Sequence, residues 1–134
     1  MCFCLLFSTS VRRSWGATVG IDTEVTSEGI LVIRLHGRML LKDLHGLESK
    51  FKKLINDHKS VIVDLSGLEV LFSMGIRTLI VSAQMVELRG GKLVLLAPIP
   101  DVLAVLKASG TTKLIPICKD REEAERIVLK SAAP

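Results

Sequence analysis

The chain has 134 residues, with 18 basic and 14 acidic side chains; hydrophobic residues make up 49% of it and aromatic residues only 4%. This length fits one domain with an aliphatic core, because two halves would each be too small to bury a good core. The net charge of +4 does not indicate a nucleic-acid partner, since the basic residues are spread without interleaved aromatic side chains, and no apolar run reaches the roughly 18 residues that membrane insertion as a helix needs.

Residues 1–17 are interpreted as a leading tail. Met1 to Phe7 is apolar, but no basic region precedes it and it is too short for a usual secretory segment. Val11 to Ala17 then interrupts any continuation. We expect this tail to be disordered or to reflect a mis-assigned start, and we expect the domain to span residues 18–131.

The first half of the domain predicts a hairpin followed by a helix. Residues 18–25 and 30–35 alternate apolar and polar side chains, and Ser27-Glu-Gly29 supplies a turn, which predicts an antiparallel pair. We expect Gly37 to end the second strand. Apolar residues at helical spacing, with lysines between them, then predict an amphipathic helix over 42–57.

The second half alternates strands and helices. Val61 to Leu65 is predicted to be a buried strand closed by Ser66-Gly67. The apolar spacing from Ile76 onward predicts a helix over 73–89 that Gly90-Gly91 ends. The remaining predicted elements are a strand over 92–97, a short helix from Pro98 and Pro100 to Gly110, a strand over 114–118 and a helix capped by Asp120. A hairpin followed by alternating helices and strands predicts an α/β sandwich.

The junction between the strand at 61–65 and the helix at 73–89 carries the candidate site. Ser73 lies three residues before the apolar helix face begins, where its hydroxyl can accept a hydrogen bond from a free amide of the first turn. A helix N-terminus also favours negative charge, so a phosphate on Ser73 would be stabilised there. A phosphoacceptor and a plain N-cap are therefore both open interpretations of Ser73.

Several segments resemble the STAS domain, a family that includes the bacterial anti-sigma factor antagonists. The resemblance covers residues 19 to 130 and is carried by Asp64-Leu-Ser-Gly-Leu68, Ser73-x-Gly75-Ile76, Arg89-Gly-Gly-Lys-Leu-Val-Leu95, Pro98 to Gly110, Leu114-Ile-Pro-Ile117 and Asp120-Arg-Glu-Glu-Ala124. It implies a small, mixed, mostly parallel β-sheet with about four helices packed mainly on one face. It also implies a cytoplasmic regulator that binds an anti-sigma factor reversibly.

In that family the serine motif resembles Asp-Ser-Ser/Thr-Gly, and its first serine is phosphorylated by an anti-sigma factor that is also a kinase. Here the matching residues are Phe72-Ser73-Met74-Gly75, which keep the serine and the glycine. The family's Gly-x-Leu-Asp is here Gly37-Arg-Met-Leu40, without the acid. Both departures indicate a changed partner surface. The resemblance implies a serine kinase-like anti-sigma partner, which itself binds ATP, and a phosphatase that resets the switch.

Apolar residues surround Ser73, and those left outside the core would form a contact patch. The predicted partner-binding residues are Leu71, Phe72, Ser73, Met74, Gly75, Arg77 and Leu40.

Other classes of function receive less support from the sequence. Three cysteines, two of them in the tail, form no disulfide framework, and Cys118 is interpreted as a small core residue on a strand. No nucleophile–base pair, phosphate-binding glycine loop or metal-ligand spacing is evident, so we expect neither an enzyme nor a cofactor or metal. Two alternatives remain: a phosphorylation-independent STAS adaptor subunit of a transport ATPase complex, and a small-molecule or nucleotide-binding sensor.

Overall fold

The computed structural model describes residues 19–38 and 44–132. The predicted tail over 1–17 and Leu40 lie outside these residues. The elements follow one another as β2 (Val19–Val25), β3 (Leu31–Arg38), α2 (Leu44–Ile55), β4 (Ser60–Val70), α3 (Ser73–Leu88), β5 (Lys92–Leu96), α4 (Pro100–Ala108), α5 (Thr111–Leu114), β6 (Ile117–Cys118) and α6 (Arg121–Ala132).

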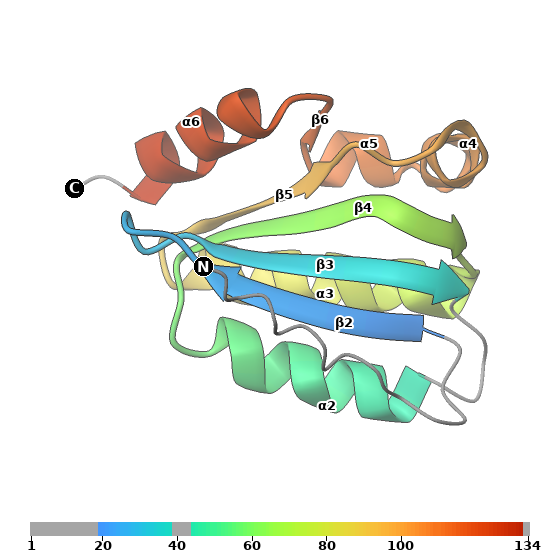
Figure 1. Ribbon diagram of the computed structural model, residues 1–134, viewed down its shortest axis with the longest axis horizontal. Coiled ribbons are helices and arrows are strands. Elements are labelled where there is room, and N and C mark those ends of the chain that lie inside the picture. The colour runs from blue at the N-terminus through green and yellow to red at the C-terminus, as the bar shows by residue number, and fades with distance from the viewer. Residues whose placement is uncertain (1–18, 39–43, 133–134) are drawn as a thin grey trace, which may run out of the picture.

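The five strands form one mixed sheet in the order β2-β3-β4-β5-β6 (Figure 1). The hairpin of β2 and β3 is antiparallel, as predicted, and the other three neighbouring pairs are parallel. The hairpin turn is closed where the Gly29 amide donates to the Thr26 carbonyl oxygen at 2.9 Å, and Gly29 has a φ of 85°. The predicted α/β class with a small, mostly parallel sheet is confirmed.

Alternate strand residues point to opposite faces of this sheet, as strand geometry requires. We call the face covered by α2 and α3 the first face and the face covered by α6 the second face; the two layers lie on opposite sides of the sheet in Figure 1. The core of the first face contains Leu31, Ile33, Leu35, Leu47, Phe51, Ile55, Val61, Val63, Leu65, Leu79, Val86, Leu93 and Leu95. The core of the second face is smaller and contains Ile30, Val32, Ile62, Val94, Leu96, Cys118, Ala124 and Val128.

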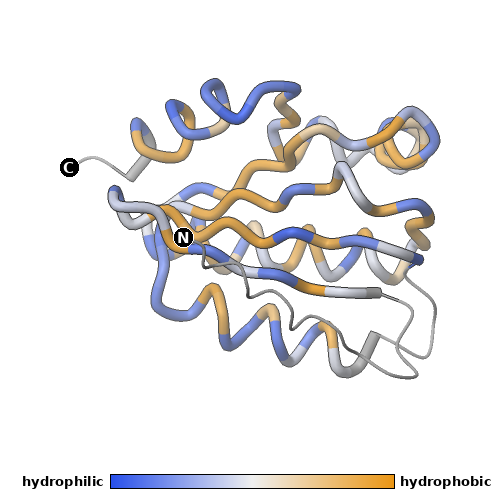
Figure 2. The backbone as a smooth tube through the Cα atoms, viewed as in Figure 1, coloured by the Kyte–Doolittle hydropathy of each residue, from blue (hydrophilic) through white to orange (hydrophobic). Residues whose placement is uncertain are grey.

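Helices therefore pack mainly on the first face, where α4 also joins the core through Val102 and Leu106, and α6 is the exception. The strands are the apolar centre of the molecule, and the helices alternate apolar and polar residues around it (Figure 2). Within the described residues there are five helices instead of about four, because Thr111–Leu114 forms a short extra turn of helix.

Three predicted boundaries were wrong, and each has a structural reason. Gly37 does not end its strand: β3 continues to Arg38 with Gly37 at a φ of 89°, beside a register irregularity. Ser66 and Gly67 do not close β4 either, because the strand keeps pairing with β3 as far as Val70. The predicted strand over 114–118 is shorter in the structure and covers only Ile117–Cys118. Leu114 is the last residue of α5 and Ile115 is its C-cap, so neither belongs to the strand.

The C-terminal end of α3 follows the prediction closely. Gly90 has a φ of 83°, a conformation that glycine adopts without strain. The Gly91 amide donates to the Val86 carbonyl oxygen at 3.0 Å and the Gly90 amide to that of Glu87 at 2.9 Å. These two bonds make a Schellman motif that ends the helix and turns the chain directly into β5.

Candidate functional site

The site is the junction between the end of β4 and the start of α3. Leu71, only 5% exposed, is buried in the core of the first face and fixes the chain as it leaves the strand. Phe72 is extended, with φ and ψ of −100° and 167°, and serves as the N-cap residue. The Ile76 amide donates to the Phe72 carbonyl oxygen at 2.9 Å, which starts the helix. A buried leucine and a buried helix turn thus hold the short exposed segment between them.

Ser73 is the first residue of α3 and is exposed. The N-cap interpretation of Ser73 was wrong, because Phe72 occupies that position and no side chain there makes a capping hydrogen bond. The prediction failed because the helix begins three residues before its first core residue, so Ser73 lies inside the helix and not before it. Its hydroxyl is thus not used as the cap of α3.

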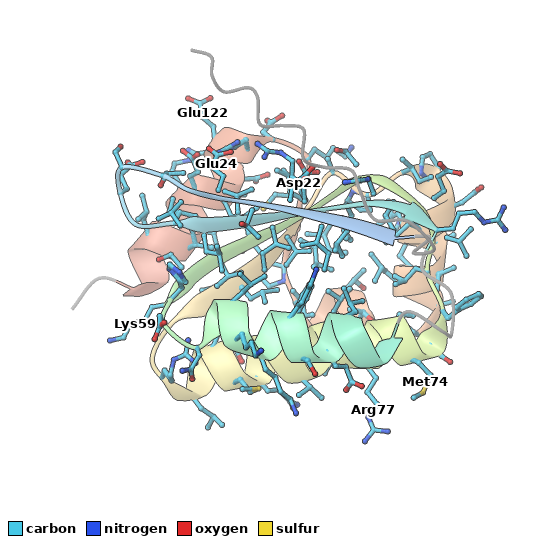
Figure 3. All side chains as sticks on the ribbon, turned by 60° about the horizontal axis from the view of Figure 1, so that its bottom comes forward. Asp22, Glu24, Lys59, Met74, Arg77 and Glu122 are labelled. Atoms are coloured by element: carbon cyan, nitrogen blue, oxygen red, sulfur yellow. The ribbon has the colours of Figure 1, made fainter. Side chains whose placement is uncertain are left out.

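The predicted contact residues divide between the surface and the interior. Phe72 and Met74 are 37% and 46% exposed, and Arg77 is exposed one helical turn after Ser73. Leu71 and Gly75 are buried beneath them. The structure therefore brings together an exposed surface of four residues, Phe72, Ser73, Met74 and Arg77, which we call the junction surface; Met74 and Arg77 lie at the start of α3 in Figure 3.

The electrostatics of this helix end favour an anion. The Ile76 amide is the first that donates to a carbonyl oxygen at the start of the helix. The amides of Ser73, Met74 and Gly75 precede it and have no acceptor within the helix. The first turn of α3 contains no acidic residue. The aligned peptide dipoles place partial positive charge at this end, and Arg77 adds a full positive charge nearby. A negative group on the Ser73 hydroxyl would lie within this positive field.

A cluster of polar side chains that was not predicted from the sequence lies on the second face, in the part that α6 leaves open. His36 Nε2 lies 3.3 Å from Asp22 Oδ2, and Arg34 Nε lies 3.9 Å from Asp64 Oδ2. A small pocket of about 100 Å³ lies among them, lined by Arg34, Leu35, His36, Asp64, Ser66 and Gly67. The available signal was the strand alternation, which puts Arg34 and His36 on the same face as Val32.

Cys118 has the structural role that was predicted, as a buried residue on β6. Burial raises the pKa of the Cys118 thiol, and the nearby Glu123 carboxylate raises it further. This thiol therefore behaves as a small core side chain. Among the described residues, no three His, Cys, Asp or Glu side chains are grouped so that they could hold a metal ion. In the same part of the chain, none of the helices has the length and apolar character to cross a membrane.

Comparisons with known proteins show what the chain is similar to. It is 28% identical over 108 residues to the putative anti-sigma factor antagonist BtrV of Bordetella bronchiseptica, covering 80% of this chain and 92% of that protein. A crystal structure of an anti-sigma factor antagonist from Mycobacterium paratuberculosis matches with a TM-score of 0.72 and 20% identity, over 87% of this chain and 99% of that one.

The anti-sigma factor antagonist SpoIIAA in its unphosphorylated form matches with a TM-score of 0.67 and 22% identity, over 80% of this chain and 95% of that one. SpoIIAA of Bacillus is also known in a phosphorylated form, which matches with a TM-score of 0.62 and 21% identity, over 80% and 98% of the two chains. The model of the STAS domain matches residues 22–124. Because this match covers most of the chain, the protein belongs to the STAS domain family.

Proposed function

We propose that this protein is an anti-sigma factor antagonist that binds its partner reversibly through the junction surface. The observation that carries the proposal is the exposure of two large apolar side chains, Phe72 and Met74, on either side of an exposed serine at a helix N-terminus. Exposed apolar residues grouped in this way are typical of protein–protein contact sites. The partner is an anti-sigma factor, the kind of protein that relatives with this description oppose.

Phosphorylation of Ser73 is the proposed switch. A phosphate would add about two negative charges and three acceptor oxygens next to the free amides of the first turn of α3. Arg77, four residues on along the helix, can form an ion pair with it. The free protein would therefore accept the phosphate without loss of fold.

The same phosphate would oppose binding of a partner. It would place charge between Phe72 and Met74, and an apolar partner surface would have to desolvate that charge to bind. We therefore assign the unmodified form to binding and the phosphorylated form to release. SpoIIAA, which has been solved in both phosphorylated and unphosphorylated forms, supports this type of switch.

In this scheme the protein is a substrate and not an enzyme. The anti-sigma partner acts as the serine kinase and supplies the ATP site, and a separate phosphatase removes the phosphate. The protein needs no cofactor or metal of its own. We assign it to the cytoplasm, where sigma factors act.

The test measures partner binding by calorimetry for three forms of residue 73. Ser73→Ala keeps the surface neutral and should keep the wild-type affinity, whereas Ser73→Glu should weaken binding about tenfold, because one carboxylate carries only part of the phosphate charge. Ser49→Glu, on the exposed face of α2, is the matched control and should bind like the wild type. Incubation with the cognate kinase and ATP should add one phosphate by intact mass, and Ser73→Ala should prevent it.

A phosphorylation-independent adaptor in a transport ATPase complex is the second candidate. It is favoured by the apolar flanks of Ser73, since Phe72 and Met74 offer a kinase no polar feature for recognition. Equal affinity of all three forms, together with no phosphate by mass, would reject the switch and leave binding that does not depend on phosphorylation, as the adaptor requires.

A further inference from the structure

The outward face of α3 carries a row of apolar side chains that no described element covers. Met74, Val81 and Leu88 are spaced seven residues apart, so they lie along one line of the helix. Their exposed fractions are 46%, 37% and 87%, and Leu88 is the most exposed large hydrophobic residue among those that the structure describes. The opposite face of α3 is used entirely by the core, through Ile76, Leu79, Ala83 and Val86. We call Met74, Val81 and Leu88 the apolar row.

We propose that the apolar row is a self-association surface, on which a second copy of this chain packs its own α3 antiparallel about a two-fold axis at Val81. The row is symmetric about its centre, because Met74 and Leu88 each lie seven residues, or about 10 Å, from Val81. A two-fold axis therefore places Val81 against Val81 and Met74 of each copy against Leu88 of the other. An interface between identical copies must be self-complementary in this sense.

The shape of the surface at one end of the row fits this arrangement. A shallow depression of about 350 Å³ is lined by Gln84, Glu87 and Leu88. The two-fold axis places Met74 of the second copy against Leu88, at the edge of this depression. Methionine suits such a position, because its unbranched side chain adapts to irregular surfaces.

The charges of α3 select the antiparallel orientation. The helix contains one basic residue, Arg77, in its first half and one acidic residue, Glu87, at its end. At 100° per residue both lie on the same flank of the apolar row, so the two-fold axis brings Arg77 of each copy next to Glu87 of the other, offset by only about 3 Å along the axis. A parallel arrangement would instead place the two Arg77 side chains at the same level but on opposite flanks of the contact, so neither would lie next to a Glu87. Glu87 remains available, since only its Oε2 approaches Lys92, at 3.3 Å, on the surface.

The expected association is weak and concentration-dependent. One helix face per copy buries less area than a standard interface, and contact along the whole row requires a shallow crossing angle of about 20°. Because Met74 belongs both to the apolar row and to the junction surface, the dimer and the partner complex exclude each other. The pairing itself does not depend on the proposed function.

Analytical ultracentrifugation of the full chain over a concentration series tests the proposal. The wild type should dimerise reversibly, and Leu88→Asp should raise the dissociation constant at least tenfold. Leu114→Asp is the matched control: Leu114 is also an exposed leucine, 57% exposed, but lies on α5 outside the row. It should leave the constant unchanged, and circular dichroism should show both variants folded.

Charge reversal tests the two-fold geometry directly. Arg77→Glu and Glu87→Arg should each weaken the dimer, and the double variant should restore it, because both pairs re-form with opposite sign. Mixing the two single variants should also restore association, since each then supplies the charge that the other lacks. A chain that stays monomeric at all concentrations would overturn the proposal. This is the result expected if a helix of another protein, and not a second copy, covers the apolar row. Failure of the double variant and of the mixture to restore association would overturn it too.

Discussion

The two faces of the sheet are covered in different ways. On the first face, α2 and α3 pack a continuous aliphatic core in which Phe51 and Ile55 are fully buried. Arg89, at the end of α3, donates to the carbonyl oxygens of Ile55, the last residue of α2, and of His58 in the loop that follows. This layer positions the junction surface, because α3 begins there.

On the second face, α6 contributes a narrow apolar contact through Ala124 and Val128. The Ser60 hydroxyl of β4 also donates to the Val128 carbonyl oxygen of α6 at 3.2 Å. A third attachment is ionic: the Glu24 carboxylate on β2 lies 2.7 Å from the Arg34 guanidinium and 3.0 Å from that of Arg121 on α6. In Figure 3, Glu24 and Glu122 lie on the side of the molecule opposite Met74 and Arg77. The first face is therefore stabilised mainly by packing, whereas the cover of the second face depends partly on charge and so on pH.

The largest expected loss in the free energy of unfolding comes from a core substitution on the first face. Phe51→Ala should lower the free energy of unfolding by about 3–5 kcal/mol, because it removes a fully buried ring between α2 and the sheet. Val128→Ala on the second face should cost about 2 kcal/mol, from two lost methyl groups and a small cavity. Urea denaturation of both variants measures the contrast. Equal losses would mean that Val128 is packed more tightly than Phe51 for each carbon removed.

A smaller effect is expected on the open part of the second face, where His36 lies between two glycines of the neighbouring strands. A Cβ at Gly20 would lie 2.1 Å from His36 Cε1, so Gly20→Ala should displace the imidazole and separate it from Asp22. We expect a loss of about 1 kcal/mol, at the low end for point substitutions because the ring can move. The His36 ring signals in NMR should shift, while those of core methyl groups on the first face stay in place.

The ionic attachment of α6 should make the second face sensitive to acid. Hydrogen bonds from Arg121 and then from Arg34 lower the pKa of Glu24 below its usual 4.5. A lowered pKa in the folded state means that the Glu24 carboxylate stabilises the fold above about pH 4.5 and that this stabilisation is lost as the pH falls through the lowered pKa.

Comparison of the wild type with Glu24→Gln across pH measures this contribution. The wild type should be more stable by up to about 1 kcal/mol near neutral pH, the size expected of a half-exposed ion pair, and the difference should vanish in acid. Amide exchange in α6 should speed up over the same range, while exchange in α3 should not. A difference that persists in acid would show that Glu24 acts by packing and not by charge.

The smallest effect concerns Ala97, which packs at the margin of the second-face core with a φ of 51°. This left-handed conformation strains any residue with a Cβ. Ala97→Gly should relieve the strain, and the entropy that glycine loses on folding offsets part of the gain. We expect a net stabilisation of a few tenths of a kcal/mol, seen as a small rise in melting temperature. Destabilisation would indicate that the lost methyl contact outweighs the strain.

Local patterns in the sequence were sufficient to predict most of the elements. Gly90-Gly91 ended α3 as expected, because a helix stop depends on neighbouring backbone groups alone. Leu65, Leu79, Leu95 and Leu106, each on the apolar side of a predicted element, are all 1% exposed or less, because strand alternation and helical spacing identify the buried side of an element. The errors at Gly37 and Ser66-Gly67 had a common cause. Glycine and serine usually mark turns, but here pairing between β3 and β4 continues through both segments and keeps them within their strands.

The candidate site could be predicted only in part. Ser73, Met74 and Arg77 were assigned to the candidate site from the sequence, and the structure shows that all three are exposed. Which of Leu71 and Phe72 faces outward depends on how tightly the chain turns after β4. The polar cluster of the second face was missed, because Asp22, Arg34 and Asp64 come from three strands and meet only through the register of the sheet.

The sequence by itself therefore determined the class of fold, the order of its elements and the serine at the start of α3, since these follow from periodicity and from contacts between near neighbours. Only the tertiary structure decided where Ser73 lies within the helix, which apolar side chains remain outside the core and how charge is divided between the two faces. Those features depend on the packing of segments far apart in the chain, where burial, and not local propensity, decides the outcome.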